Sequence, residues 1–200
     1  MKKEIIKSKN IFSTLKRFAS EGWEYTLESK NYIFSSTIAF FFFIWVGFVF
    51  ADQLTFLNEI ISGMKSSMAE YSGNDLSMAI FLSNTKSAFF SLFLGILLGL
   101  LSIITLILNG TLVGYVMHAL WIDSGVTHFW RLLPHGIFEL PALFISWGLG
   151  IKLGMFIFTS EEGKELKRRL IGSLKAFLFI IIPLLLIAGF IEGTLITFLK

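Results

Sequence analysis

Two charged residues, Lys152 and Glu192, stand inside otherwise apolar stretches of this 200-residue sequence. A charge at the centre of a membrane is costly, so each of these side chains needs either a partner or a function. Upstream of both, the segment Leu132–Ala142 places two prolines, a histidine and a glutamate within apolar sequence. We therefore expect any functional site to lie at this segment.

His135 and Glu139 are four residues apart, so they share one face if a helix begins as early as His135, and this spacing could bind a metal. If the helix begins near Phe138 instead, Pro141 falls in its first turn and Glu139 lies near the positive end of the helix dipole. Three roles for Glu139 stay open: bonding backbone amides of a broken segment, handling a proton or ion, and metal ligation. We favour the first, and we expect neither a metal nor another cofactor.

Glu192 lies on one apolar segment with Gly189 and Gly193, where a neighbouring helix could come close enough to supply a partner. Lys152 is about 20 Å from Glu139 along its own segment, nearer the inner face, where its long stem can snorkel. We therefore expect Glu192 to pair with other groups than Lys152, namely His118, His135 or Arg131. A structural role and a proton-relay role for Glu192 both stay open.

The composition indicates one polytopic membrane domain. Hydrophobic residues make up 54% of the chain, and the mean hydropathy of +0.75 exceeds that of soluble domains. The absence of Cys excludes disulfides and thiolate sites. No phosphate loop or nucleophile motif occurs, so we assign no catalytic residue and lean against an enzyme. The basic residues flank apolar segments rather than forming a surface with interleaved aromatics, so no nucleic-acid partner is expected.

The apolar segments predict an all-α bundle, because a membrane span needs about 20 apolar residues. The expected segments are 32–51, 87–108, 111–122, 138–158 and 174–199, with Pro183 as a kink in the last. Asn109-Gly110 is a turn dipeptide and predicts a chain reversal after the second segment. The third segment reaches only about 18 Å as helix. We therefore expect a broken or re-entrant segment near Asp123–Ile137, buried in protein or lining a cavity.

The basic flanks predict the orientation, because Lys and Arg favour the cytoplasmic side. Seven of them precede the first segment: Lys2, Lys3, Lys7, Lys9, Lys16, Arg17 and Lys30. Four follow the fourth: Lys164, Lys167, Arg168 and Arg169. Both flanks inside require about five crossings, with a cytoplasmic N-terminus and an extracytoplasmic C-terminus in the plasma membrane. The polar residues His118, His135, Glu139 and Glu192 would then lie in the outer half.

Three regions follow from this layout. Residues 1–31 alternate apolar and basic positions at helical spacing, which predicts a cytoplasmic helix on the anionic leaflet or against the protein's own loops. We see no removable signal peptide in them. Residues 32–200 form the membrane domain, and within it 52–86 make an extracytoplasmic excursion that contains an amphipathic helix.

Glycines recur at the spacing that lets helix backbones approach closely. They are Gly95 and Gly99, Gly110 and Gly114, Gly150 and Gly154, and Gly189 and Gly193. Four such pairs predict either a tight intramolecular bundle, which we favour, or a homodimer seam.

The string Leu133-Pro-His-Gly-Ile-Phe-Glu-Leu-Pro-Ala142 resembles the stage II sporulation protein M family of small polytopic membrane proteins. The resemblance runs from Asn84 to the C-terminus and includes Asn109-Gly110, the Gly150–Gly154 stretch and Ile191-Glu-Gly193. It implies a core site made of Pro134, His135, Gly136, Glu139, Pro141 and Glu192. In endospore formers it implies a membrane anchor for extracytoplasmic peptidoglycan-degrading enzymes, and it assigns no catalytic residue.

We therefore expect a non-enzymatic membrane scaffold or anchor that recruits membrane or extracytoplasmic protein partners, including peptidoglycan-remodelling ones. The alternative is a transporter or channel component that moves a small solute, ion or lipid. Its cavity would be lined by His118, His135, Glu139 and Glu192. An intramembrane metal enzyme ranks third.

Overall fold

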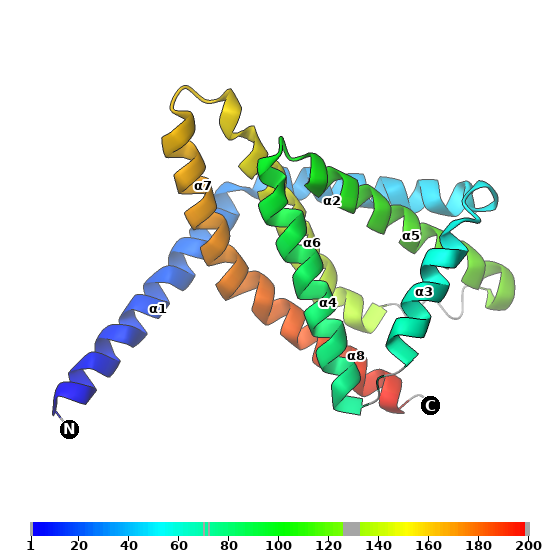
Figure 1. Cartoon of the computed structure of the whole chain (residues 1–200), viewed down its shortest axis with the longest axis horizontal. Coiled ribbons are helices and arrows are strands. Elements are labelled where there is room, and N and C mark those ends of the chain that lie inside the picture. The colour runs from blue at the N-terminus through cyan, green and yellow to red at the C-terminus, as the bar shows by residue number, and fades with distance from the viewer. Residues whose placement is uncertain (1, 70, 72, 126–132, 199–200) are drawn as a thin grey trace.

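The computed structural model describes residues 2–69, 71, 73–125 and 133–198, which form helices joined by short turns (Figure 1). The α-helices are α1 (Lys2–Glu28), α2 (Lys30–Val49), α3 (Leu57–Ala69), α4 (Gly73–Phe93), α5 (Leu100–Ser124), α6 (Leu133–Gly154), α7 (Glu162–Ala176) and α8 (Ile182–Phe198). Short 3₁₀ turns cover Ala51–Gln53, Leu94–Ile96 and Met155–Phe158, and a π-helical turn covers Phe177–Ile181.

Five segments of the described chain are long and apolar enough to cross a membrane. They are Lys30–Val49, Asp75–Ile96, Leu100–Asp123, Gly136–Phe158 and Glu162–Ile191. The prediction of an all-α bundle with about five spans is therefore confirmed, although several boundaries differ from those expected.

Helix α6 is the centre of the bundle. It packs on one side against α2 and α5, which lie side by side, and on the other against α4 and α8. Figure 1 shows the two pairs diverging as they run away from α1, so that the bundle has the form of a wedge. We call the end where α1 meets α2 at Ser29 the α1 end, and the end where α5 stops at Ser124 and α6 starts at Leu133 the wedge end.

The chain reverses between the second and third spans at Leu97–Gly99, not at Asn109-Gly110 as the turn dipeptide predicts. Leu98 and Gly99 have φ of 59° and 72°, a left-handed conformation that favours glycine. Helix α5 runs straight through Asn109-Gly110. Gly110 is a packing glycine, because a Cβ there would lie 2.9 Å from the Phe40 carbonyl oxygen of α2.

This correction removes the reason for expecting a short third span. Helix α5 has 25 residues and reaches about 37 Å, enough to cross the bilayer without help. The length argument for a re-entrant segment near Asp123–Ile137 therefore no longer applies. Residues 126–132, which form the middle of that segment, lie outside the described part of the chain, so its path stays a prediction.

Helix α6 begins at Leu133, several residues before the expected start near Phe138. Pro134 rather than Pro141 occupies its first turn, where a missing amide hydrogen costs nothing. Pro141 lies inside the helix and is exposed at its surface. Since α6 includes His135, the spacing of four residues places His135 and Glu139 on one helical face.

Two other boundaries also move. Helix α4 begins at Gly73, before the expected start of the second span, and α3 is amphipathic. The extracytoplasmic excursion over 52–86 stays a prediction. The last span is α7, a π-helical turn and α8 in succession, and Pro183 is the second residue of α8, two positions after that turn. Because proline has no amide hydrogen, it disrupts the regular hydrogen bonding of the preceding turn, where the helix is π-helical.

The glycine pairs face other helices of the same chain. A Cβ on Gly95 would overlap the backbone of Gly150, and one on Gly154 would overlap the backbone of Gly99. Gly114 stands in the same relation to Ile44 of α2. Gly193 lies in the part of α8 whose side-chain surroundings are outside the described residues. Close backbone packing thus joins the turn at Leu97–Gly99 to the end of α6.

Candidate functional site

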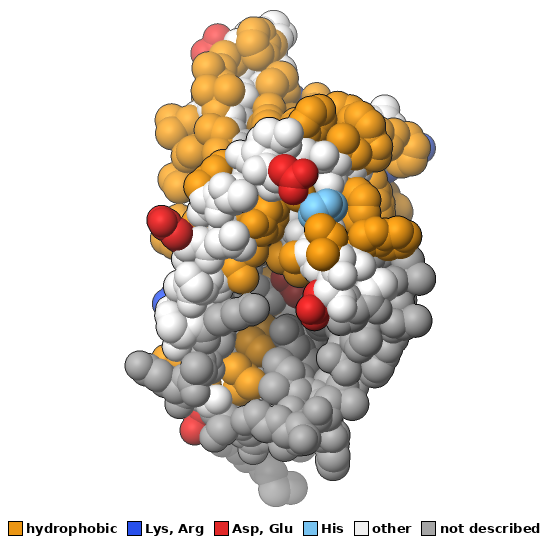
Figure 2. Space-filling model, turned by 90° about the vertical axis from the view of Figure 1, so that its right-hand side faces the viewer, with side chains coloured by type: hydrophobic (Ala, Val, Ile, Leu, Met, Phe, Trp, Pro, Cys, Tyr) orange, Lys and Arg blue, Asp and Glu red, His pale blue; other side chains and the backbone are white. Residues whose placement is uncertain are grey.

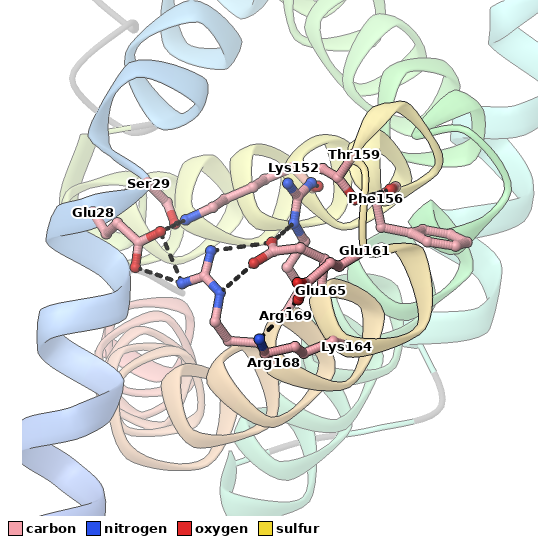
Figure 3. A network of polar contacts seen from close by, with 10 residues as sticks. All are labelled: Glu28, Ser29, Lys152, Phe156, Thr159, Glu161, Lys164, Glu165, Arg168 and Arg169. Carbon is pink, nitrogen blue, oxygen red and sulfur yellow. Dashed lines mark hydrogen bonds and ion pairs between the residues drawn. The ribbon is translucent and has the colours of Figure 1, made fainter.

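Lys152 is buried at the α1 end, with 4% of its surface exposed. Its ammonium donates hydrogen bonds to Glu28 Oε1 at 3.0 Å and to Ser29 Oγ at 2.9 Å, and it lies 4.2 Å from the centroid of the Tyr25 ring (Figure 3). A buried cation with a carboxylate, a hydroxyl and an aromatic face around it is well compensated.

Arg168 and Arg169 of α7 extend this cluster. Arg168 donates to both oxygens of Glu28, at 3.0 and 2.9 Å, and to both oxygens of Glu165, at 2.9 and 3.2 Å. Arg169 donates to Glu165 Oε2 at 2.9 Å and to the main-chain oxygen of Lys152. These bonds tie the middle of α7 to the end of α1 and to the end of α6 (Figure 3).

The electrostatics of α1 follow from this cluster. Partial burial raises the pKa of Glu28, but hydrogen bonds from Lys152 and Arg168 outweigh it, so the net pKa lies below its ordinary value. About two helical turns earlier, the hydrogen bond from Lys175 lowers the pKa of Glu21. Burial raises the pKa of Tyr25 to about 12. Both carboxylates are therefore ionised at neutral pH, and α1 is ion-paired along α7.

The ammonium of Lys152 reaches Glu28 and Ser29, which directly precede the first span, and the protein buries it there. Its expected snorkelling stays a prediction. The expectation that Lys152 does not pair with Glu192 agrees with this geometry, since Glu28 and Ser29 occupy it. The cluster fastens α1, α6 and α7 together.

A cavity of about 240 Å³ lies between α2, α5 and α6, on the wedge-end side of the core. Its lining residues are Phe40, Asn109, Leu112, Val113, Val116, Gly136, Glu139, Leu140 and Leu143. Figure 2 looks onto the wedge end, where acidic side chains and a histidine gather among hydrophobic ones around a recess. The cavity thus combines apolar walls with one carboxylate and one carboxamide.

Phe40 joins the wall of this cavity to the aromatic core of the bundle. Phe40 is 1% exposed and stacks on Trp147 of α6, with ring centroids 5.3 Å apart, and it meets Phe144 edge-on at 5.3 Å. In the α5 wall, the Asn109 amide nitrogen donates to the Thr105 carbonyl oxygen at 2.7 Å, which fixes the carboxamide against α5. Glu139 and Asn109 therefore stand in a mainly apolar recess.

The stage II sporulation protein M family model matches residues 36–196. The chain belongs to this family. It is also 31% identical over 128 residues to an uncharacterized protein of Methanocaldococcus jannaschii, a match that covers 61% of this chain and 58% of that protein. The chain thus matches less than two thirds of that relative's length. No solved structure was found to match.

The family-like segment contributes two of its expected core residues, Gly136 and Glu139, to the cavity wall. His118 does not line the cavity, since its ring packs edge-on against Phe48 of α2, with centroids 5.4 Å apart. Pro141 faces outward. Of the remaining candidates, Arg131 lies outside the described residues, and so do the side chains of Pro134, His135 and Glu192.

No group of three or more His, Asp or Glu side chains in the described part of this family member is placed to hold a metal ion. Glu139 itself takes part in an interaction within the protein. The arrangement around it can bind a polar group of a ligand or partner, but it offers no second acid or base of the described residues for catalysis.

Sequence reasoning missed Asn109 as a cavity residue, because the Asn-Gly dipeptide reads as a turn. Its position midway along a long apolar stretch was the available signal. The reasoning also missed Glu28 and Arg168 as partners of the Lys152 cluster. The sequence showed that Lys152 needs a negatively charged partner. That partner, Glu28, is 124 residues away in the sequence.

Proposed function

We propose that this family member is a membrane scaffold that holds a partner protein at its wedge end. In this proposal the N-terminus and the α1 end face the cytoplasm, and the wedge end and C-terminus face outside. The orientation rests on the Lys and Arg residues before α2 and in α7. The partner belongs to the membrane or the cell envelope, and the family resemblance favours proteins that remodel peptidoglycan.

The observation that carries the proposal is the shape of the cavity. It is a recess among α2, α5 and α6 near the wedge end, and the stacked rings of Phe40 and Trp147, the packed glycines and the Lys152 cluster lie between it and the α1 end. A transport path has to continue to the other side, whereas a docking site needs only a recess. The described residues therefore favour docking.

The side chains of the cavity wall limit the kind of partner that can bind there. Leu112, Val113 and Leu140 offer apolar contact, and Glu139 offers an acceptor within hydrocarbon depth. An apolar helix or lipidated segment that carries a donor or a positive charge fits this combination, since a carboxylate in low dielectric favours such a group.

Site-specific photo-crosslinking in cells tests the proposal. A photoreactive amino acid at Val116, in the cavity wall, should give discrete protein adducts, and the substitution Val113→Trp, which fills the cavity, should abolish them. Ile104 on the same helix is 47% exposed outside the cavity and serves as the control position. Adducts that are equal at Val116 and Ile104, or that survive Val113→Trp, would contradict docking in the cavity.

A second candidate, a transporter component, is favoured by the presence of Glu139 and Asn109 together in the cavity. Liposomes with an imposed pH gradient and an internal pH dye distinguish the two. A scaffold gives no proton flux in the wild type or in Glu139→Gln and Glu192→Gln. Flux in the wild type that disappears in either variant would replace the scaffold by a proton-coupled transporter.

The proposed orientation has its own test, because the chain has no Cys. Single cysteines at Asp75, near the start of α4, and at Lys167, on α7, occupy exposed positions at opposite ends. An impermeant thiol reagent added to intact cells should label the first and spare the second. Labelling of the Lys167→Cys variant from outside would contradict the proposed orientation.

A further inference from the structure

A groove of about 490 Å³ runs along the bend between α1 and α2. Its lining residues are Trp23, Thr26, Leu27, Lys30, Asn31, Ile33, Phe34, Thr37 and Ile145. At 100° per residue, Trp23 and Leu27 lie on the face of α1 opposite to Glu21 and Glu28, which bind α7. The groove is therefore separate from both the Lys152 cluster and the wedge-end cavity.

The floor of the groove is apolar. Ile33, Phe34 and Ile145 supply aliphatic and aromatic surface, and Phe34 is 66% exposed. The two threonine hydroxyls donate inside their own helices, Thr26 to the Gly22 carbonyl oxygen and Thr37 to the Ile33 carbonyl oxygen, both at 2.9 Å. Since these hydroxyls are used, the floor presents a surface suited to a hydrocarbon chain.

The rim of the groove is polar and positively charged. Trp23 stands at its head with 53% of its surface exposed, as is typical of the membrane interface. Lys30 and Asn31 begin the first span beside it. From Lys30 to Thr37 the groove descends about 10 Å along α2 into the hydrocarbon. The groove thus has polar residues where a lipid headgroup would lie and apolar residues where an acyl chain would lie.

Three carboxylates of α1, Glu21, Glu24 and Glu28, line a separate pocket beside α7 and not this groove. Glu24 accepts a hydrogen bond from Ser20. Glu21 binds Lys175, and Glu28 binds Lys152 and Arg168, all on the opposite face. No ion pair in the described part of the chain involves Lys30. A phosphate at the rim would therefore meet an amide donor and a lysine that is not already engaged in an ion pair.

We propose that this groove binds one anionic phospholipid from the leaflet on the α1 side. Its phosphate lies at Lys30 and Asn31, its glycerol beside Trp23, and one acyl chain lies over Ile33, Phe34 and Ile145. The site does not depend on the scaffold proposal, since it uses neither the cavity nor a protein partner.

Native mass spectrometry of the purified full chain tests the site. The protein in detergent is titrated with dioleoylphosphatidylglycerol or dioleoylphosphatidylcholine, and bound lipids are counted. We expect one phosphatidylglycerol to be retained more tightly than phosphatidylcholine. Lys30→Gln should weaken that binding about fivefold, the effect expected for one lysine at a membrane surface. Thr37→Trp, which obstructs the acyl path, should remove both lipids from the site.

Lys167→Gln is the matched control, because Lys167 is an exposed lysine on α7 outside the groove and the charge change is the same. It should leave the lipid count unchanged. Equal binding of the two lipids, or equal losses in Lys30→Gln and Lys167→Gln, would reduce the site to ordinary annular lipid and overturn the proposal. Displacement of phosphatidylglycerol by inorganic phosphate would also overturn it, in favour of a site for a free anion.

Discussion

The two ends of the bundle use their polar residues in different ways. At the α1 end Lys152 is buried and bonded to Glu28 and Ser29, and helix backbones touch through Gly150 and Gly154. At the wedge end the helix pairs diverge, and Glu139 stands in the wall of a cavity. Both ends place a charge within an apolar span. The charge belongs to a closed structural cluster at one end and to an open recess at the other.

This difference teaches that a charge in a membrane span does not by itself mark a functional site. The cost of burying Lys152 is offset by a carboxylate, a hydroxyl and the face of Tyr25, all within one locality. Glu139 lies where the packing leaves room for something else. Lys152 and Glu139 differ in whether protein atoms or a cavity surround the side chain. Several substitutions test that difference.

The largest effect is expected from glycine replacement at the two ends of α6. A Cβ on Gly154 would overlap the Gly99 amide nitrogen, so Gly154→Ala should destabilise the protein by about 3 kcal/mol. A Cβ on Gly136 would meet Leu140 Cδ1 at an ordinary 3.7 Å. Gly136→Ala should therefore stabilise the helix by about 0.5 kcal/mol. Unfolding in detergent micelles with increasing SDS measures both, and equal losses would refute the contrast between the ends.

The next effect concerns the Lys152 cluster. Glu28→Ala leaves a buried ammonium with only a hydroxyl and a ring, which should cost about 2 kcal/mol. Adding Lys152→Met to this variant should recover most of the loss, because the unpaired charge is then gone. Glu161→Ala is the control, since its pair with Lys164 is exposed and should contribute less than about 1 kcal/mol. The same unfolding assay applies, and purely additive losses would count against a coupled cluster.

A smaller effect is expected at the wedge end. Glu139→Gln keeps the shape and hydrogen-bonding capacity of the side chain and should preserve stability in detergent. Glu139→Leu removes the acceptor and should lower stability by about 1 kcal/mol through the partner left unpaired. Thermal unfolding monitored by circular dichroism compares them. Equal stability of the two variants, with function lost in both, would favour ion handling over a structural role.

The smallest effect is a dependence on pH. The pKa of Glu28 in the folded protein lies below its ordinary value of 4.5, so below pH 4.5 the unfolded chain binds more protons at this group. Its contribution to stability is therefore complete above that pH and is lost as the pH falls through the folded pKa. Glu28→Gln should make the decline in melting temperature below pH 4.5 shallower. An unchanged decline would mean that other carboxylates, such as Glu21, account for it.

Much of the fold could be predicted because span length and helix packing are local properties. Apolar runs of about 20 residues give the number of spans, and glycines at four-residue spacing mark where helices approach. The turn dipeptide at Asn109-Gly110 misled because a glycine serves a turn and a close helix contact equally well. Only contact with Phe40 of α2 shows which role it has.

The sequence by itself determined that this chain is a five-span helical membrane protein and that Lys152 and Glu139 required an explanation. The family-like segment also determined which part of α6 carries the site, through Gly136 and Glu139. Only the tertiary structure decided that Lys152 is enclosed by its partners, whereas Glu139, which also has an interaction within the protein, lies in the wall of a cavity. The reason is physical: the free energy of a buried charge depends on the groups within a few ångströms, and here those groups come from positions more than 100 residues apart.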